Sequence, residues 1–113
     1  MQKVFITGIA GFLGSHLAKK MHELGWSVSG NDNFLGADRT NLLPFVEFFE
    51  ADCCDLASIS KAMHGADLLF HCAATAHEGL SVFSPTFITR NNFEASVSTF
   101  TAAINANVRR IVF

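Results

Sequence analysis

The stretch that decides the fold is residues 7–17, Thr7-Gly8-Ile9-Ala10-Gly11-Phe12-Leu13-Gly14-Ser15-His16-Leu17. It follows the short apolar run Val4-Phe5-Ile6 and leads into apolar residues at helical spacing. We therefore expect a strand, a glycine turn and the start of a helix. The three glycines recur at three-residue intervals, which permits a sharp turn, close approach of a pyrophosphate and close packing of the helix on the sheet.

This turn predicts a site for the phosphates of a dinucleotide at the N-terminus of the helix. The N–H groups around Gly11, Phe12 and Leu13 would point at the phosphates, and the helix dipole favours the same negative charge. The alternative interpretation is a glycine-rich turn that binds no ligand, because such a motif is a hypothesis until its flanking elements are established.

Outward from this turn, apolar runs alternate with helical patterns along the chain. Strands are expected at residues 2–6, 26–31, 45–50, 67–74 and 108–113, helices at 11–24, 56–64 and 84–107, and loops at 35–43 and 75–83. This alternation predicts one α/β domain over residues 1–113, a doubly wound parallel sheet with strand order 3-2-1-4-5 that stops in its fifth strand. A cofactor would lie where the order reverses, between the first and fourth strands.

Two helices carry patterns that predict their packing. The first helix should face the sheet with its apolar residues, which are Phe12, Leu13, Leu17, Met21 and Leu24. The long helix at 84–107 has a broad apolar face that should have more to pack on than this chain provides. Asn91 and Asn92 interrupt it near its first turns, and an amide turned inward there could tie neighbouring strand ends together. Asp55 is expected to cap the helix at 56–64.

The second strand ends in Asp32-Asn33-Phe34, which places an acid at its tip. A carboxylate there can accept hydrogen bonds from the ribose hydroxyls of an adenosine. It would repel a 2′-phosphate, and no arginine follows immediately to receive one, so the pattern favours NAD over NADP. The alternative is a turn-forming Asp-Asn pair.

Two further strand ends carry residues suited to a dinucleotide. Asp52 follows the third strand, where its side chain could receive the adenine amino group. Cys72, Ala73 and Ala74 follow the fourth strand, and their small side chains leave room for a nicotinamide ribose.

The composition limits the classes of function. Of 113 residues, 50% are hydrophobic and 16% are charged, with a net charge of −2, so neither nucleic acid nor a membrane is a predicted partner. No secretory leader or apolar run of about 20 residues is present, and a cytoplasmic location is expected. The three cysteines lack zinc-site spacing and the helical His16 and His22 lack a metal partner nearby, so no metal is predicted.

Taken in order, these motifs resemble the nucleotide-sugar epimerases and dehydratases of the extended short-chain dehydrogenase/reductases. The matching residues are Thr7-Gly8-x-x-Gly11-Phe12-Leu13-Gly14-Ser15-His16-Leu17, Asp32-Asn33, Asp52, His71-Cys72-Ala73-Ala74, Asn92 and Arg110-Ile111-Val112-Phe113. The match spans this chain but only the N-terminal part of such a protein.

The resemblance implies an NAD-binding Rossmann domain and assigns its contacts. The pyrophosphate would lie against Gly8, Gly11, Phe12, Leu13 and Gly14, and the adenosine ribose against Asp32, Asn33 and Phe34. The adenine would lie against Asp52 and Cys53, and the nicotinamide half against Cys72, Ala73, Ala74 and Asn92. For the complete protein the resemblance implies a nucleotide-sugar substrate and a possible homodimer through the long helix.

The catalytic groups of the family are missing from this chain. Its members use a tyrosine acid/base with a lysine four residues later, and this sequence contains no tyrosine. Hydride transfer to NAD requires a positioned base, and neither His71 in a strand nor His77 in a loop fits that role. We expect the chain alone to be inactive.

Three functions stay open at this point. The chain is the NAD-binding part of a nucleotide-sugar epimerase or dehydratase, in which a hydride moves transiently between sugar and NAD. Alternatively, it is a non-catalytic module that senses or sequesters NAD, or the cofactor domain of another short-chain reductase acting on a small carbonyl.

Overall fold

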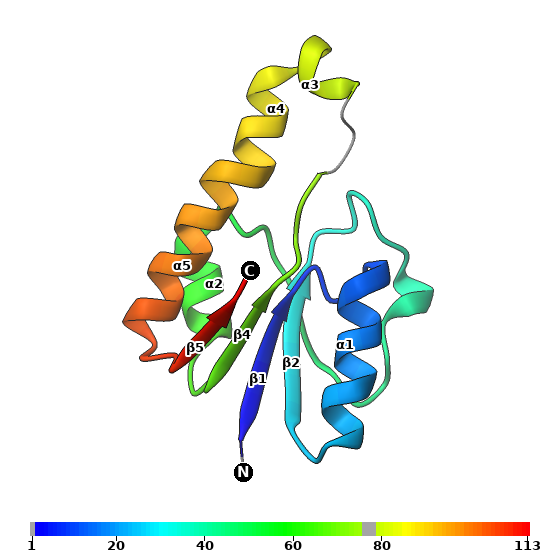
Figure 1. Cartoon of the computed structure of the whole chain (residues 1–113), viewed down its shortest axis with the longest axis vertical. Helices are drawn as coiled ribbons and strands as arrows, with labels where there is room; N and C mark the ends of the chain where they lie inside the picture. Colours follow the sequence, from blue (N-terminus) through cyan, green and yellow to red (C-terminus); the bar gives the residue numbers. More distant parts are fainter. Residues whose placement is uncertain (1, 76–78) are drawn as a thin grey trace.

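A five-stranded parallel sheet runs through the computed structural model, which describes residues 2–75 and 79–113 (Figure 1). Its strands are β1 (Lys3–Thr7), β2 (Ser27–Asp32), β3 (Glu47–Glu50), β4 (Leu68–His71) and β5 (Arg110–Val112). Their order is β3-β2-β1-β4-β5. The predicted α/β fold class and strand order are therefore confirmed.

Helices connect successive strands and cover both faces of the sheet. They are α1 (Phe12–Glu23), the 3-10 turn η1 (Arg39–Asn41), α2 (Leu56–Ala62), α3 (Leu80–Phe83), α4 (Pro85–Thr89), the π-helical turn η2 (Arg90–Glu94) and α5 (Ala95–Asn105). As predicted, Asp55 caps α2, since its carboxylate accepts hydrogen bonds from the N–H and the hydroxyl of Ser58 at 3.2 and 2.7 Å. No helix of the described residues is both long and apolar enough to cross a membrane.

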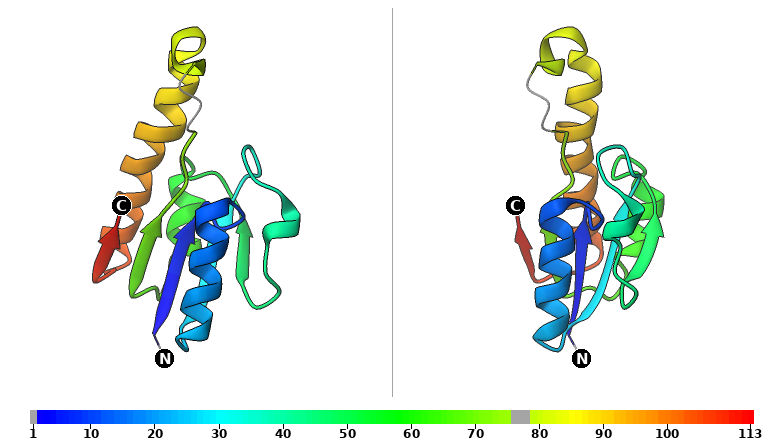
Figure 2. Two further views of the ribbon diagram at one scale, coloured as in Figure 1. Left: turned by 45° about the vertical axis from the view of Figure 1, so that its right-hand side comes forward. Right: turned by 90° about the vertical axis from the view of Figure 1, so that its right-hand side faces the viewer.

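The central strand β1 supplies side chains to two hydrophobic cores. Val4 and Ile6 pack with α1 on one face, whereas Phe5 packs with α2 and α5 on the other. Figure 2 shows α1 on the opposite side of the sheet from α2 and α5. Such burial on both faces explains why β1 is a continuous apolar run rather than an alternating one.

The predicted apolar stripe of α1 is wrong at most of its positions. Phe12 is 82% exposed and Leu13 and Leu24 are also exposed, while the buried face consists of Gly14, Ala18 and Met21. The small side chains of Gly14 and Ala18 let the helix lie close against the sheet, and Met21 with the half-buried Leu17 completes the contacting face.

The long helix forms as three consecutive segments, α4, η2 and α5. Pro85 opens it, as expected for a residue that lacks an N–H. The predicted loop at 75–83 instead contains α3, whose first carbonyl, at Leu80, accepts a hydrogen bond from Ser84 N–H at 2.7 Å. His77 lies outside the described residues. Much of the predicted apolar face of the long helix is exposed, notably at Phe93 and Ile104.

Three strands are shorter than predicted. Residues 45–46 and 108–109 precede β3 and β5 without being part of them, and residues 72–74 leave the sheet directly after His71. The N–H groups of Cys72 and Ala73 donate to the Thr7 side chain instead of a neighbouring strand, at 3.0 and 3.1 Å. The sheet therefore opens between β1 and β4, at the end where the glycine turn lies.

Candidate cofactor site

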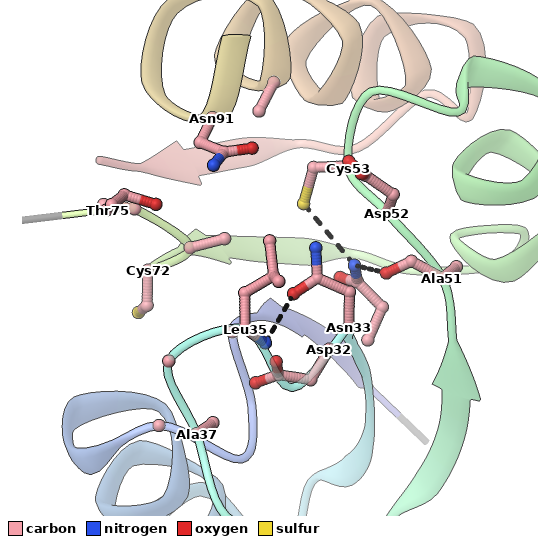
Figure 3. A pocket seen from close by; sticks show the side chains of 17 residues that line it. Asp32, Asn33, Leu35, Ala37, Ala51, Asp52, Cys53, Cys72, Thr75 and Asn91 are labelled. Atoms are coloured by element: carbon pink, nitrogen blue, oxygen red, sulfur yellow. Dashed lines mark hydrogen bonds between the residues drawn. The ribbon is translucent and has the colours of Figure 1, made fainter. Parts of the chain in front are cut away.

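A pocket lies where the strand order reverses, above the carboxyl ends of β1, β2 and β4 (Figure 3). Nine predicted site residues line it, namely Gly8, Gly11, Asp32, Asn33, Asp52, Cys53, Cys72, Ala73 and Ala74. Five others, Phe12, Leu13, Gly14, Phe34 and Asn92, are outside its lining. Asn31, Leu35 and Asn91 are among the lining residues that the sequence did not assign to a ligand.

The glycine turn is closed by its own backbone. Gly8 has a φ of +67°, and the N–H of Gly11 donates to the Gly8 carbonyl at 3.0 Å. The prediction that the Gly11 N–H is free for a phosphate is therefore wrong. Phe12 and Leu13 begin α1, and the first N–H groups of a helix have no acceptor within it. These two N–H groups stay the predicted phosphate donors.

Asp32 is buried, and it organises the tip of β2 while keeping room for a ligand. One carboxylate oxygen accepts the Ala10 N–H at 3.1 Å, and the other accepts the Phe34 N–H at 2.9 Å. A carboxylate has about four acceptor positions, so two stay open. Asp32 thus links the glycine turn to the loop after β2, and can still accept hydroxyl groups.

An arginine that the sequence did not flag lies beside this loop. The Arg39 guanidinium is 4.2 Å from the centre of the Phe34 ring, and it forms an ion pair with Glu50. Phe34 has a φ of +60°, which turns its side chain toward η1 rather than into the pocket. Arg39 follows Asp32 closely enough in sequence to suggest that it could bind the 2′-phosphate of NADP. Instead, its guanidinium is held by the Phe34 ring and the Glu50 carboxylate.

The predicted adenine side contains a buried amide. Asn31 Nδ2 donates to the Ala51 carbonyl at 3.0 Å and to Cys53 Sγ at 3.4 Å, while Asn31 Oδ1 has no partner among the described residues. Asp52 uses one oxygen to accept the Cys54 N–H at 2.8 Å. An amide at the carboxyl end of a strand, directly before Asp32, was the available signal for Asn31.

All three thiols are held in their neutral form. Burial raises the pKa of Cys53 and of Cys72, and burial together with the nearby Asp52 raises the pKa of Cys54 to about 11. None is in a disulfide. They are therefore weak nucleophiles at neutral pH.

The nicotinamide side is built by the exit of β4 and by η2. Asn92 Oδ1 accepts the Thr75 N–H at 2.8 Å, and Asn92 Nδ2 donates to the Thr75 carbonyl at 3.0 Å. The amide is turned inward, but it ties the segment after β4 to η2 instead of tying neighbouring strand ends together, and its contacts leave Asn92 outside the pocket lining. Asn91 lines the pocket instead, and its buried Nδ2 has no partner in the described part of the chain.

His71 joins β4 to the long helix rather than acting as a base. Its Nδ1 is 2.7 Å from Thr7 Oγ1 and its Nε2 is 2.9 Å from Ser96 Oγ. The rings of Phe100 and Phe113 lie against it, so the side chains in contact with His71 are uncharged. Burial lowers the pKa of its imidazole.

Stability is expected to fall as this histidine becomes protonated. Because the pKa of His71 is lowered in the folded chain from its ordinary 6.5, the unfolded chain binds more protons below that pH. The contribution to stability is present above pH 6.5 and is lost as the pH falls toward the folded pKa. Urea unfolding at about pH 7.5 and about pH 5.5 measures the loss, which should shrink in His71→Asn. The control is His64→Gln, which removes an exposed imidazole; an unchanged loss in His71→Asn would contradict the prediction.

Together, a glycine turn between β1 and α1, an acid at the tip of β2 and a pocket at the reversal of strand order define a dinucleotide-binding α/β domain. The model of the NAD-dependent epimerase/dehydratase family matches residues 4–113, and the chain belongs to that family. Its members use NAD, as predicted.

Individual relatives agree with this assignment. UDP-glucose 4-epimerase of Caenorhabditis elegans is 30% identical in an alignment that covers 97% of this chain and 36% of the relative. Cinnamoyl-CoA reductase 1 of Petunia hybrida is 31% identical, over 99% of this chain and 34% of the relative. A structure of UDP-glucose 4-epimerase from Thermus thermophilus in complex with NAD has a TM-score of 0.92 and 28% identity, over 99% of this chain and 37% of that one. This chain thus spans about a third of the length of these proteins.

Proposed function

We propose that the pocket binds NAD, and that the chain is the cofactor-binding part of a nucleotide-sugar epimerase or dehydratase. The observation that carries the proposal is Asp32, a buried carboxylate at the tip of β2 with acceptor positions left for ribose hydroxyls. Asn33 would assist it, because its side chain lines the same part of the pocket. The names of the nematode and Thermus relatives support a UDP-sugar as the substrate of the complete protein.

Unpartnered polar atoms support a polar ligand in this pocket. Oδ1 of Asn31 and Nδ2 of Asn91 are buried without a partner in residues 2–75 and 79–113. Buried polar groups in proteins are nearly always paired. An acceptor on the adenine side and a donor on the nicotinamide side fit a ligand with polar groups at both ends, as NAD has.

Within the proposed reaction this chain binds and orients. NAD, when bound, supplies a hydride acceptor for a carbon of the substrate. The N–H groups of Phe12 and Leu13 would hold the phosphates, Asp52 and Cys53 would border the adenine, and Cys72, Ala73 and Ala74 would border the nicotinamide ribose. The chain has no tyrosine and His71 has partners on both ring nitrogens, so we expect no turnover from this chain alone.

A reductase acting on a small carbonyl is the second candidate function. The Petunia relative, a cinnamoyl-CoA reductase, favours it at an identity close to that of the epimerase. A non-catalytic NAD-binding module is the third, favoured by the missing tyrosine. Turnover of UDP-glucose by the complete protein would support the epimerase, and turnover of a CoA thioester would support the reductase. NAD binding without either reaction would support the module.

We infer two further properties of the protein. A cytoplasmic location is supported by three cysteines without a disulfide. A homodimer through the long helix is supported by the exposed apolar side chains of Phe93, Val97 and Ile104 on that helix.

The cofactor proposal predicts a preference for NAD that depends on Asp32. Calorimetric titration should show tighter binding of NAD than of NADP, because the Asp32 carboxylate repels a 2′-phosphate and Arg39 is paired with Glu50. Asp32→Asn should weaken NAD binding by about tenfold or more, the effect of losing charge-assisted hydrogen bonds. It should also reduce the ratio of NAD affinity to NADP affinity.

The matched control is Asp38→Asn, which changes an exposed carboxylate in the same loop that accepts the N–H and hydroxyl of Thr40. NAD affinity should be unchanged in this variant. Equal affinity for NAD and NADP, or unchanged NAD affinity in Asp32→Asn, would overturn the proposal.

A further inference from the structure

His71 stands at the centre of a hydrogen-bonded chain that links three elements. On one side of its ring lies Thr7, at the end of β1, and on the other lies Ser96, in α5. Ser96 Oγ is in turn 2.6 Å from the Asn92 carbonyl of η2. The two elements that flank the nicotinamide side of the pocket are therefore connected through one imidazole.

The partners of Thr7 fix the direction of every hydrogen bond in this chain. A threonine hydroxyl has one proton and two acceptor positions. The N–H groups of Cys72 and Ala73 donate to Thr7 Oγ1 at 3.0 and 3.1 Å, which occupies both acceptor positions. The hydroxyl proton must then go to His71 Nδ1.

The directions of the other two hydrogen bonds follow from this first one. Because Nδ1 of the neutral ring is an acceptor, its proton is on Nε2, which donates to Ser96 Oγ. The Ser96 hydroxyl donates to the Asn92 carbonyl, a group that can only accept. Each donor has one acceptor, so a single arrangement satisfies all of these groups.

This arrangement fixes the wall of the pocket. Thr7 holds the backbone of residues 72 and 73, and Asn92 holds both backbone groups of Thr75. Cys72, Ala73, Ala74 and Thr75 all line the pocket. His71 joins the two anchors, because Ser96 bonds to the carbonyl of the residue that clamps Thr75.

We propose that His71, as the neutral tautomer with its proton on Nε2, is a positioning residue that fixes residues 72–75 for the nicotinamide half of NAD. The proposal rests on the proposed NAD function of this pocket. It assigns His71 no contact with the cofactor. The loss of any one of these hydrogen bonds should therefore weaken binding of the nicotinamide half of NAD and leave binding of the adenosine half intact.

The test compares NAD with ADP, which lacks the nicotinamide ribose and nicotinamide. In Ser96→Ala the affinity for NAD should fall about fivefold, the effect of one lost hydrogen bond, while the affinity for ADP stays unchanged. The matched control is Ser98→Ala, the same change in the same helix at a hydroxyl that is buried without a partner in the described chain. Its NAD and ADP affinities should equal those of the wild type.

A second pair of variants tests the role of the Thr7 hydroxyl as the donor to His71. Thr7→Val removes the hydroxyl at nearly constant volume and should weaken NAD selectively, whereas Thr7→Ser retains the hydroxyl and should restore NAD affinity. Nitrogen-15 NMR of the wild-type imidazole should show the proton on Nε2, a readout that does not depend on binding or on the folding of a variant.

The outcomes separate this proposal from the function on which it rests. A wild-type chain that binds neither NAD nor ADP overturns both. NAD binding with a proton on Nδ1, or equal losses of NAD and ADP affinity in Ser96→Ala, overturns the positioning role alone. Unchanged NAD affinity in both Ser96→Ala and Thr7→Val does the same.

Discussion

Gly14→Ala is expected to lower the free energy of unfolding by about 3 kcal/mol or more, the upper range for inserting a methyl group into a filled space. A Cβ at Gly14 would lie 2.2 Å from the Gly8 carbonyl oxygen and 2.9 Å from Ile9 Cα. Both are backbone atoms of the turn, so no side-chain rotation relieves the clash. The helix would have to move away from the turn that positions it, and urea unfolding monitored by circular dichroism measures the loss.

The control for this change is Gly36→Ala in the loop after β2. A Cβ at Gly36 has no atom within 4 Å, so the free energy of unfolding should change by less than about 0.5 kcal/mol. A Gly14→Ala chain as stable as Gly36→Ala would show that α1 does not depend on close contact with the glycine turn. If Gly14→Ala folds at low temperature, NAD affinity should still be lower, because α1 carries the N–H groups of Phe12 and Leu13.

The spacing of the glycines could be interpreted from the sequence because it reflects backbone geometry. Position 14 is restricted by backbone atoms of Gly8 and Ile9, which are local in the chain, whereas Gly8 has a φ of +67° and lies against the backbone of residues 72 and 73. The strand order was predictable for a similar reason, since alternating strands and helices allow few parallel arrangements. The acid at the tip of β2 followed from the same local logic.

Other features depend on side-chain and backbone contacts that the sequence pattern does not reveal. The N–H of Gly11 is used inside the turn, and Arg39 is held by Phe34 and Glu50, neither of which a motif indicates. The roles of Asn91 and Asn92 were harder still to assign, because they depend on the π-helical turn that decides which amide faces Thr75 and which lines the pocket.

Hydrophobicity alone also misplaced the large side chains of α1. Phe5 and Phe12 are both phenylalanines in apolar surroundings of the sequence, yet Phe5 is fully buried and Phe12 is 82% exposed. The difference arises because β1 is covered on both faces, whereas at the start of α1 the residues turned toward the core are Gly14, Leu17 and Ala18, and Phe12 points away from it. Replacing each of these two phenylalanines by alanine should therefore destabilise the fold to different extents.

Phe5→Ala is expected to lower the free energy of unfolding by about 3 to 5 kcal/mol, the range for truncating a fully buried aromatic ring. Phe5 is 0% exposed and packs in the core between β1 and the helices α2 and α5, where its neighbours include Ile59 and Leu69. Strands on both sides of β1 hold its backbone in register, so the structure has little freedom to collapse into the cavity. Equilibrium urea unfolding measures the effect, and Phe12→Ala, which removes the same ring from an exposed position, should change the stability by less than about 0.5 kcal/mol. Comparable losses in the two variants would contradict the burial of β1 between two helical layers, and with it the placement of the pocket at the end of that strand.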